Sequence, residues 1–130
     1  MSTILSQVAS PTNLNAAWRR LRTDKAYWRP SISRSEMERN LLLHLLTLAQ
    51  ELETGTFRPD QVRFFPVAKG DGGQRIISSH FLRDKLGQRA LLSILTPIAE
   101  QYFHHDSFGY RPGRSIDMAL ARVRQFVAKA

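Results

Sequence analysis

Apolar residues recur at helical spacing in four parts of the chain, and three of these parts have a polar residue that can begin a helix. The second part is the most apolar: leucines form a broad stripe along it, which is typical of a helix packed into a core. Gly55 provides a stop signal for that helix. The predicted helices begin at Asn13 and run for about ten residues, from the Ser35–Glu38 capping box to Gly55, from Phe81 to about Phe103, and from Ser115 to the end of the sequence.

Between the second and third predicted helices the apolar pattern changes from helical to extended. Two β-rich runs, 62–67 and 74–79, flank an Asp-Gly turn, which predicts a β-hairpin. Pro66 cannot donate a hydrogen bond to a neighbouring strand, so its strand is expected at an edge. The predicted fold class is therefore α+β, mostly helical with one β-hairpin.

The remaining segments define the expected organisation. Residues 1–12 are small and polar and are predicted to be a flexible lead-in, while 13–130 form one region. Pro97 is expected to divide or bend the third helix. The run Arg83-Asp84-Lys85 near its start is interpreted as a local ion-pair cluster on the helix, which would contribute little to stability if it were exposed.

Charge narrows the choice of partner. The chain has 130 residues with 19 Lys and Arg against 11 acids, giving a net charge of +8 and a pI of about 10.8. This balance favours a polyanion such as RNA or DNA over a merely solvated basic surface. No cysteine is present, which excludes disulfides, thiolate metal sites and a cysteine nucleophile. Without a signal peptide or a long apolar run, the sequence predicts a cytoplasmic protein with no membrane partner.

Two clusters could carry chemistry. Lys69 and Arg75 flank the hairpin turn, where paired cations could hold a triphosphate; the alternative is a solvated basic turn. His104-His105-Asp106 could be read as a metal site, but adjacent histidines rarely converge on one ion and no third ligand pattern is near. We therefore predict no metal site there.

The segment Phe108-Gly-Tyr-Arg-Pro-Gly-Arg-Ser115 is the most distinctive in the sequence. Its glycines allow unusual backbone angles and Pro112 fixes one φ, so the loop is expected to be stiff. Two guanidinium groups and two aromatic rings on a stiff loop suit a nucleotide or a nucleic-acid strand.

Three blocks, in order, resemble the N-terminal part of bacterial reverse transcriptases of the group II intron type. The first is Asn13-Leu14 with Ala17-Trp18 and the basic helix that follows; the third is the Phe108–Ser115 segment with Ala119-Leu120 after it. The second block comprises Thr56-Phe-Arg-Pro59, Pro66, Lys69, Gly72-Gly73, Arg75, Asp84, Lys85, Gln88 and Ala90-Leu91. Departures at 26–32 and 75–79 favour a diverged relative, such as a CRISPR-associated, retron or diversity-generating reverse transcriptase.

The resemblance implies the fingers of a right-handed RNA-directed DNA polymerase, with an RNA template, a DNA primer and a deoxynucleoside triphosphate as partners. It implies that Lys69, Arg75 and Arg111 contact the incoming nucleotide. The residues that it implies for contacts with template or other nucleic acid are Phe108, Tyr110, Arg111, Pro112, Arg114, Arg19 and Arg22.

The catalytic part of such an enzyme is not expected in this chain. The complete polymerase would use Mg²⁺ held by palm carboxylates, whereas the six aspartates here are scattered and none are adjacent. We therefore expect a region that stops before the palm and thumb and is inactive alone. The alternatives are a non-catalytic basic RNA-binding module and a scaffold that docks a protein through the Leu41–Leu52 face.

Overall fold

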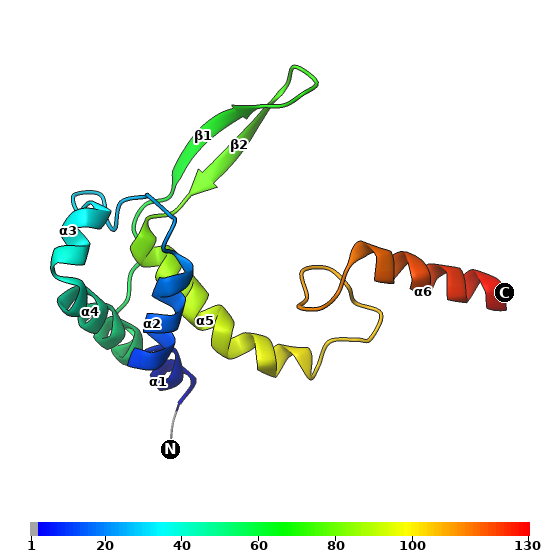
Figure 1. The fold of residues 1–130 in the computed structure, drawn as a ribbon, viewed down its shortest axis with the longest axis horizontal. Coiled ribbons are helices and arrows are strands. Elements are labelled where there is room, and N and C mark those ends of the chain that lie inside the picture. The colour runs from blue at the N-terminus through cyan, green and yellow to red at the C-terminus, as the bar shows by residue number, and fades with distance from the viewer. Residues whose placement is uncertain (1–2) are drawn as a thin grey trace. The chain divides into compact units, whose positions relative to one another are not determined.

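The computed structural model describes residues 3–130 and confirms the α+β class (Figure 1). Its described residues divide into two compact units, of which the first ends at Ile94 and the second spans Leu95–Ala130. The division falls within the long helix α5. The elements are α1 (Ile4–Val8), α2 (Pro11–Arg20), α3 (Arg34–Arg39), α4 (Leu41–Thr54), β1 (Arg63–Ala68), β2 (Gln74–Ser79), α5 (Leu82–Glu100) and α6 (Ile116–Lys129).

The core of the first unit lies among its helices. It unites the apolar faces of α1, α2, α4 and the first half of α5 with a buried tryptophan from the loop after α2. Trp18 and Trp28 meet edge to face, with ring centroids 6.0 Å apart. The most deeply buried side chains are Val8, Leu14, Trp28, Met37, Leu48, Leu82 and Leu86.

Part of the segment expected to be a flexible lead-in is ordered in the structure. Residues 4–8 form α1, Thr3 caps it, and Val8 and Ala9 are buried in the core. A short apolar helix of this kind gains its stability from packing rather than from its own length, which is why the local sequence did not indicate it.

The first predicted helix begins earlier in the structure than expected. Ser10, not Asn13, caps α2, and Pro11 occupies the first turn. Asn13 instead joins three segments: its Nδ2 donates to Val8 O (2.9 Å) and Ala90 O (3.0 Å), and its Oδ1 accepts from Ser93 Oγ (2.6 Å). Asn13 therefore joins α2 to α1 and α5 instead of capping α2.

The second and third predicted helices also differ from the structure. The capping box is Ser33 with Glu36, and the helix breaks at Asn40 into α3 and α4. Gly55 does end α4, in the left-handed conformation with φ 73°. Pro97 was expected to divide or bend the third predicted helix; it does not divide it, since α5 continues through Pro97 to Glu100 as one helix.

The hairpin forms where it was predicted. Strands β1 and β2 are antiparallel, with Phe65 opposite Ile77 and Val67 opposite Arg75, and they are a two-stranded ribbon in Figure 1. Most of its residues are exposed; only Val67, Ile77 and Ser79 are half-buried. Packing against its faces therefore contributes little to holding it in place.

The second unit contains the end of α5, the 101–115 loop and α6. Ser115 caps α6 as predicted, its side chain accepting from Met118 N at 3.2 Å. None of the residues of α6 is buried, and its apolar stripe is exposed: Ile116, Leu120, Val123 and Val127. Among the described residues, no helix is both long and apolar enough to cross a bilayer.

Candidate nucleotide and nucleic-acid interface

Lys69 and Arg75 lie on one face of the hairpin at its tip. Arg75 pairs with Val67, and Lys69 is two residues beyond Val67, so the strand alternation places both cations on the same face. Such diagonal neighbours are roughly 7–8 Å apart, within reach of one phosphate chain. Both residues are exposed. The structure therefore brings this predicted pair together and leaves its charges accessible.

The turn that joins the strands is a short loop closed by backbone hydrogen bonds. Lys69 N–H donates to Gly73 O at 2.7 Å, and Gly72 N–H donates to Lys69 O at 3.3 Å. Gly72 has φ 86°, a conformation that a glycine adopts without steric cost. The Asp71 carboxylate accepts from Gly73 N–H at 3.0 Å and fixes the turn further.

The base of the hairpin contains a buried charged cluster. Arg83, at the start of α5, pairs with Glu51 of α4, donates to Arg58 O at 3.0 Å and covers the Phe57 ring at 4.4 Å. Its neighbour Asp84 accepts from the backbone N–H of Asp60 at 2.9 Å. The expected ion-pair cluster is not local: Arg83 and Asp84 are both buried, and their partners Glu51, Arg58 and Asp60 come from distant parts of the chain.

The loop at residues 27–29 holds both ends of the hairpin. Its Tyr27 and Trp28 carbonyls accept from the N–H groups of Leu82 and Arg83, which follow β2. The third residue, Arg29, forms a two-pronged ion pair with Asp60, which precedes β1, with N–O distances of 2.8 and 3.0 Å. This hydrogen bonding to Asp60 raises the pKa of the Arg29 guanidinium.

Asp84 is the least satisfied polar group of the cluster. Its side chain is 3% exposed, and Oδ1 has no hydrogen-bond partner although it lies 3.5 Å from Arg83 Nη1. Burial raises the pKa of this carboxyl, and the nearby Asp60 carboxylate adds to the effect. The hydrogen bond from the Asp60 backbone and the Arg83 charge lower the pKa but do not cancel the burial.

Arg111 is predicted to contact template and nucleotide, and its guanidinium lies inside its own loop. Nε and Nη2 hold the Glu100 carboxylate at 2.9–3.3 Å, while Nη1 donates to His104 O (2.9 Å) and Ser107 O (2.7 Å). It also lies over the Phe103 ring at 5.2 Å. These contacts make Arg111 the organiser of the 101–115 loop. The hydrogen bond from Arg111 holds the pKa of Glu100 below its usual value.

The other predicted residues of this loop differ in accessibility. Tyr110 is fully exposed and has φ 55°, the one positive φ among the described residues other than glycine. Pro112 is also exposed, whereas Phe108 and Arg114 are half-buried and lie against each other at 4.9 Å. Arg114 donates to His105 O. Of the two aromatic residues predicted to contact nucleic acid, Tyr110 is therefore the accessible one.

Arg19 and Arg22, the remaining predicted nucleic-acid contacts, lie near the end of α2. Both are exposed, as are Arg20 and Lys25 beside them. The helix buries Leu14, Ala17 and Trp18 on its opposite side, so these cations face solvent.

His104, His105 and Asp106 do come together in the second unit. One potential ligand atom from each lies within 4.8 Å of the others, and the two imidazoles stack with centroids 4.3 Å apart. A cation already faces them: Arg122 Nε donates to Asp106 Oδ1 at 2.5 Å, and Nη2 is 3.3 Å from His105 Nε2. The bond from Arg122 lowers the pKa of Asp106.

The described carboxylates do not fit the Mg²⁺ pair that a complete polymerase would hold. Most of them already neutralise cations, and they are spread over both units rather than gathered at one point. These ion-paired acids are Asp24, Glu38, Glu51, Asp60, Asp84, Glu100 and Asp106. No step of a reaction is therefore assigned to a metal in this chain.

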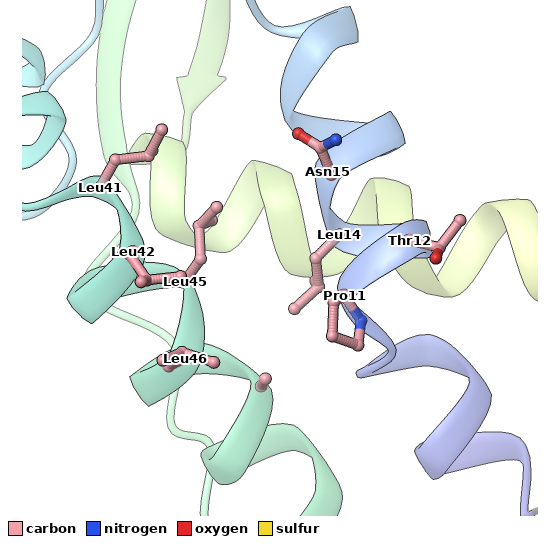
Figure 2. A pocket seen from close by; sticks show the side chains of 9 residues that line it. Pro11, Thr12, Leu14, Asn15, Leu41, Leu42, Leu45 and Leu46 are labelled. Atoms are coloured by element: carbon pink, nitrogen blue, oxygen red, sulfur yellow. The ribbon is translucent and has the colours of Figure 1, made fainter.

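An apolar cavity of about 450 Å³ lies between α2 and α4. Figure 2 shows Leu41, Leu42, Leu45 and Leu46 from α4 on one side and Leu14 from α2 on the other. On α4 itself, Leu42, Leu43 and Leu46 are 70%, 63% and 52% exposed. Part of the leucine face that we predicted to be core is thus open.

Sequence reasoning missed the burial of Arg83 and Asp84 and the pairing of Arg29 with Asp60 at the base of the hairpin. A signal existed for two of them: Arg83 and Asp84 lie between the apolar residues Phe81-Leu82 and Leu86. Such charges need partners from elsewhere if they are buried.

Comparison with known proteins gives the family context. No family model matches the sequence. The chain is 33% identical to protein YkfC of Escherichia coli over 93 residues, which are 72% of this chain and 24% of that protein. It is 27% identical over 121 residues to the COX1/OXI3 intron 1 protein of Saccharomyces cerevisiae, covering 93% of this chain and 14% of that protein.

A third relative is the group II intron-encoded protein LtrA of Lactococcus lactis, 35% identical over 79 residues, which are 60% of this chain and 13% of LtrA. The chain spans less than a quarter of the length of each of these relatives. The resemblance to group II intron-type proteins is thereby supported. The chain has intron-encoded proteins, including a group II intron-encoded protein, among its relatives.

Proposed function

We propose that this chain acts as the fingers part of an RNA-directed DNA polymerase, with its hairpin contacting the incoming nucleotide and its 108–115 loop contacting the template. The observation that carries the proposal is the pairing of Lys69 and Arg75 on one exposed face at the hairpin tip. The relatives encoded in introns supply the context.

The chemistry of the tip suits a triphosphate. Ammonium and guanidinium groups form short, charge-assisted hydrogen bonds with phosphate oxygens. Cations placed beforehand also stabilise the charge that develops on a leaving pyrophosphate. Because neither Lys69 nor Arg75 has an acidic partner in the described structure, neither has to break an ion pair to bind.

The loop contributes differently. Arg111 holds the loop closed, which leaves the Tyr110 ring and Pro112 as its outward-facing surface. An exposed aromatic ring can stack on an unpaired base, as RNA-binding proteins commonly do. In this proposal Arg111 shapes the template surface and Tyr110 touches it.

The test uses the chain itself. Adding dTTP to the ¹⁵N-labelled protein should shift the amide resonances of residues 69–75, and Lys69→Ala or Arg75→Ala should weaken the binding severalfold. Arg39→Ala, which removes an exposed cation at the end of α3, is the matched control and should bind as the unaltered chain does. If all three variants bound dTTP equally weakly, the loss would be an effect of overall charge. That result would refute the assignment of the nucleotide contact to the hairpin tip.

A second candidate function, docking of a protein helix, is favoured by the open leucines beside the α2–α4 cavity. An apolar side chain of an amphipathic helix could enter this cavity. Leu42→Ser with Leu46→Ser should then abolish binding of a leucine-rich helical peptide while RNA binding stays unchanged. If the peptide does not bind the unaltered chain, docking is rejected.

A further inference from the structure

We propose that Arg83 and Asp84 are positioning residues that set the direction of the hairpin and thereby the place of Lys69 and Arg75. The nucleotide role of the tip rests on the function proposed above. The positioning itself rests only on contacts within the first unit.

The two segments that flank the hairpin are joined through this pair. The incoming segment offers its Arg58 carbonyl to Arg83 and its Asp60 N–H to Asp84. The outgoing segment donates to the 27–29 loop: Leu82 N–H to Tyr27 O (2.9 Å) and Arg83 N–H to Trp28 O (3.2 Å). Arg83 and Asp84 lie in the first turn of α5, so they join the base of the hairpin to this helix.

The helical core provides the fixed support for this connection. Arg83 is paired with Glu51 of α4, and the Arg29–Asp60 pair adds a second link to the incoming segment. Arg63, the first residue of β1, covers the Phe81 ring at 4.8 Å and closes the base from the other side. Buried, directional contacts of this kind hold a geometry more tightly than apolar contact does.

Small rotations at the base have large effects at the tip. Six residues per strand place the tip roughly 20 Å from the base. A rotation of about 10° would therefore move it by about 3.5 Å, more than a hydrogen bond tolerates. The strands themselves are mostly exposed, so little packing along the ribbon would resist such a rotation.

Because the chain has no cysteine, the tip can be tracked by two introduced labels. Spin labels on Gly70→Cys at the tip and Gln50→Cys on α4 replace exposed residues, and a Cβ at position 70 would meet nothing within 4 Å. Electron–electron distance measurements should give a narrow distribution in this labelled background. We expect Asp84→Ala to broaden it by about a factor of two, since the incoming segment loses its tether.

Two further variants separate positioning from general destabilisation. Asp84→Asn keeps an oxygen that can accept from the Asp60 N–H, so this variant should retain the narrow distance distribution. Arg83→Lys cannot reach both Glu51 and the Arg58 carbonyl and should broaden it. The control is Asp24→Asn, which breaks the neighbouring Lys85–Asp24 pair outside the hairpin base and should leave the distribution narrow.

The outcomes are decisive in each case. Circular dichroism tests whether each variant is folded. If Asp84→Ala is unfolded, the distance distribution of Arg83→Lys decides the test. A narrow distribution in folded Asp84→Ala or in Arg83→Lys overturns the proposal, as does an equally broad one in Asp24→Asn. A dTTP titration of the same variants is read separately: failure of the unaltered chain to bind dTTP removes the proposed function but leaves the positioning result intact.

Discussion

At the scale of single residues, Asp84 has the most unusual environment among the described side chains. It carries a buried carboxylate with one oxygen lacking a hydrogen-bond partner, and its pKa is raised mainly by burial. A raised pKa means that the folded protein holds the proton more tightly than the unfolded chain does. The group therefore stabilises the fold fully below the unfolded pKa, and this contribution is lost as pH rises through the folded pKa.

Replacing Asp84 by asparagine should remove this pH dependence. We expect Asp84→Asn to be more stable than the unaltered chain at pH 7, because the neutral amide avoids the burial of a charge. The advantage should shrink as the pH falls and Asp84 itself becomes protonated. Thermal unfolding of both proteins at a series of pH values measures the difference in stability. A difference that grows as the pH falls would contradict the prediction.

The residue scale also shows what the sequence could reveal. Lys69 and Arg75 were found as a pair because a hairpin turn places them locally. The burial of Arg83 and Asp84 was missed because Glu51 and Asp60, their partners, lie 24 or more residues away. Only the tertiary structure brings such charges together.

At the scale of elements, Asn13 connects three helices of the first unit through one amide group. Its hydrogen bonds reach the end of α1 and two residues of α5, so it ties α2 to both. We expect Asn13→Ala to lower the free energy of unfolding by about 1–3 kcal/mol, because three hydrogen bonds, two of them part-buried, are lost at once.

Asn15→Ala is the matched control for that measurement. Asn15 lies on the same helix but is exposed, so its replacement should change the free energy of unfolding by less than about 0.5 kcal/mol. Urea unfolding of both variants gives the comparison. Equal losses would show that the helix itself, not the three-way connection, is affected.

Arg111 makes more hydrogen bonds within the 101–115 loop than Arg114 does, so its replacement tests how the loop is held. Arg111→Lys keeps the charge but loses the fork that binds Glu100 and two carbonyls at once. Amide hydrogen exchange at Ser107, which donates to His104 O, should become faster. The control, Arg124→Ala on the exposed side of α6, should leave the exchange rate of the Ser107 amide unchanged. An unchanged rate in Arg111→Lys would show that other contacts hold the loop.

Elements were predictable where pattern and local chemistry agreed. The hairpin, the end of α4 at Gly55 and the cap of α6 at Ser115 all depend on residues adjacent in sequence. The break at Asn40 has no glycine or proline to mark it, and the helix at 4–8 is stabilised by the burial of Val8 in the core.

At the scale of the whole molecule, the excess positive charge lies on exposed cations that are outside the ion pairs. Most acids of the described chain are used internally, where they pair with cations such as Arg29, Arg83 and Arg111. The cations left exposed and without an acidic partner include those of α2 and the hairpin tip. The net charge of +8 is therefore carried by surfaces available to a polyanion.

Single-stranded RNA should bind this chain with a strong dependence on salt. The logarithm of the binding constant should fall linearly with the logarithm of the salt concentration. Arg19→Ala with Arg22→Ala should reduce that slope by about 1.4, roughly 0.7 for each phosphate that is no longer neutralised. Fluorescence anisotropy measures both slopes. An unchanged slope would exclude α2 from the RNA surface.

The division into two units was not predicted, since we expected one region from residue 13 onward. The apolar face of α5 continues across Ile94 without a break, so nothing in its pattern marks a boundary. The core residues of α5, and those packed against the core, end at Ile94, where the first unit ends.

The backbone of Tyr110 has a consequence for how this protein would respond to selection. A left-handed conformation costs a residue with a side chain roughly 1–2 kcal/mol, and the exposed ring recovers none of it by packing. Variants chosen only for cellular abundance should therefore replace Tyr110 by glycine or asparagine. Variants chosen for nucleic-acid binding should keep an aromatic ring there, so parallel selections would show whether thermostability and activity oppose each other at this position.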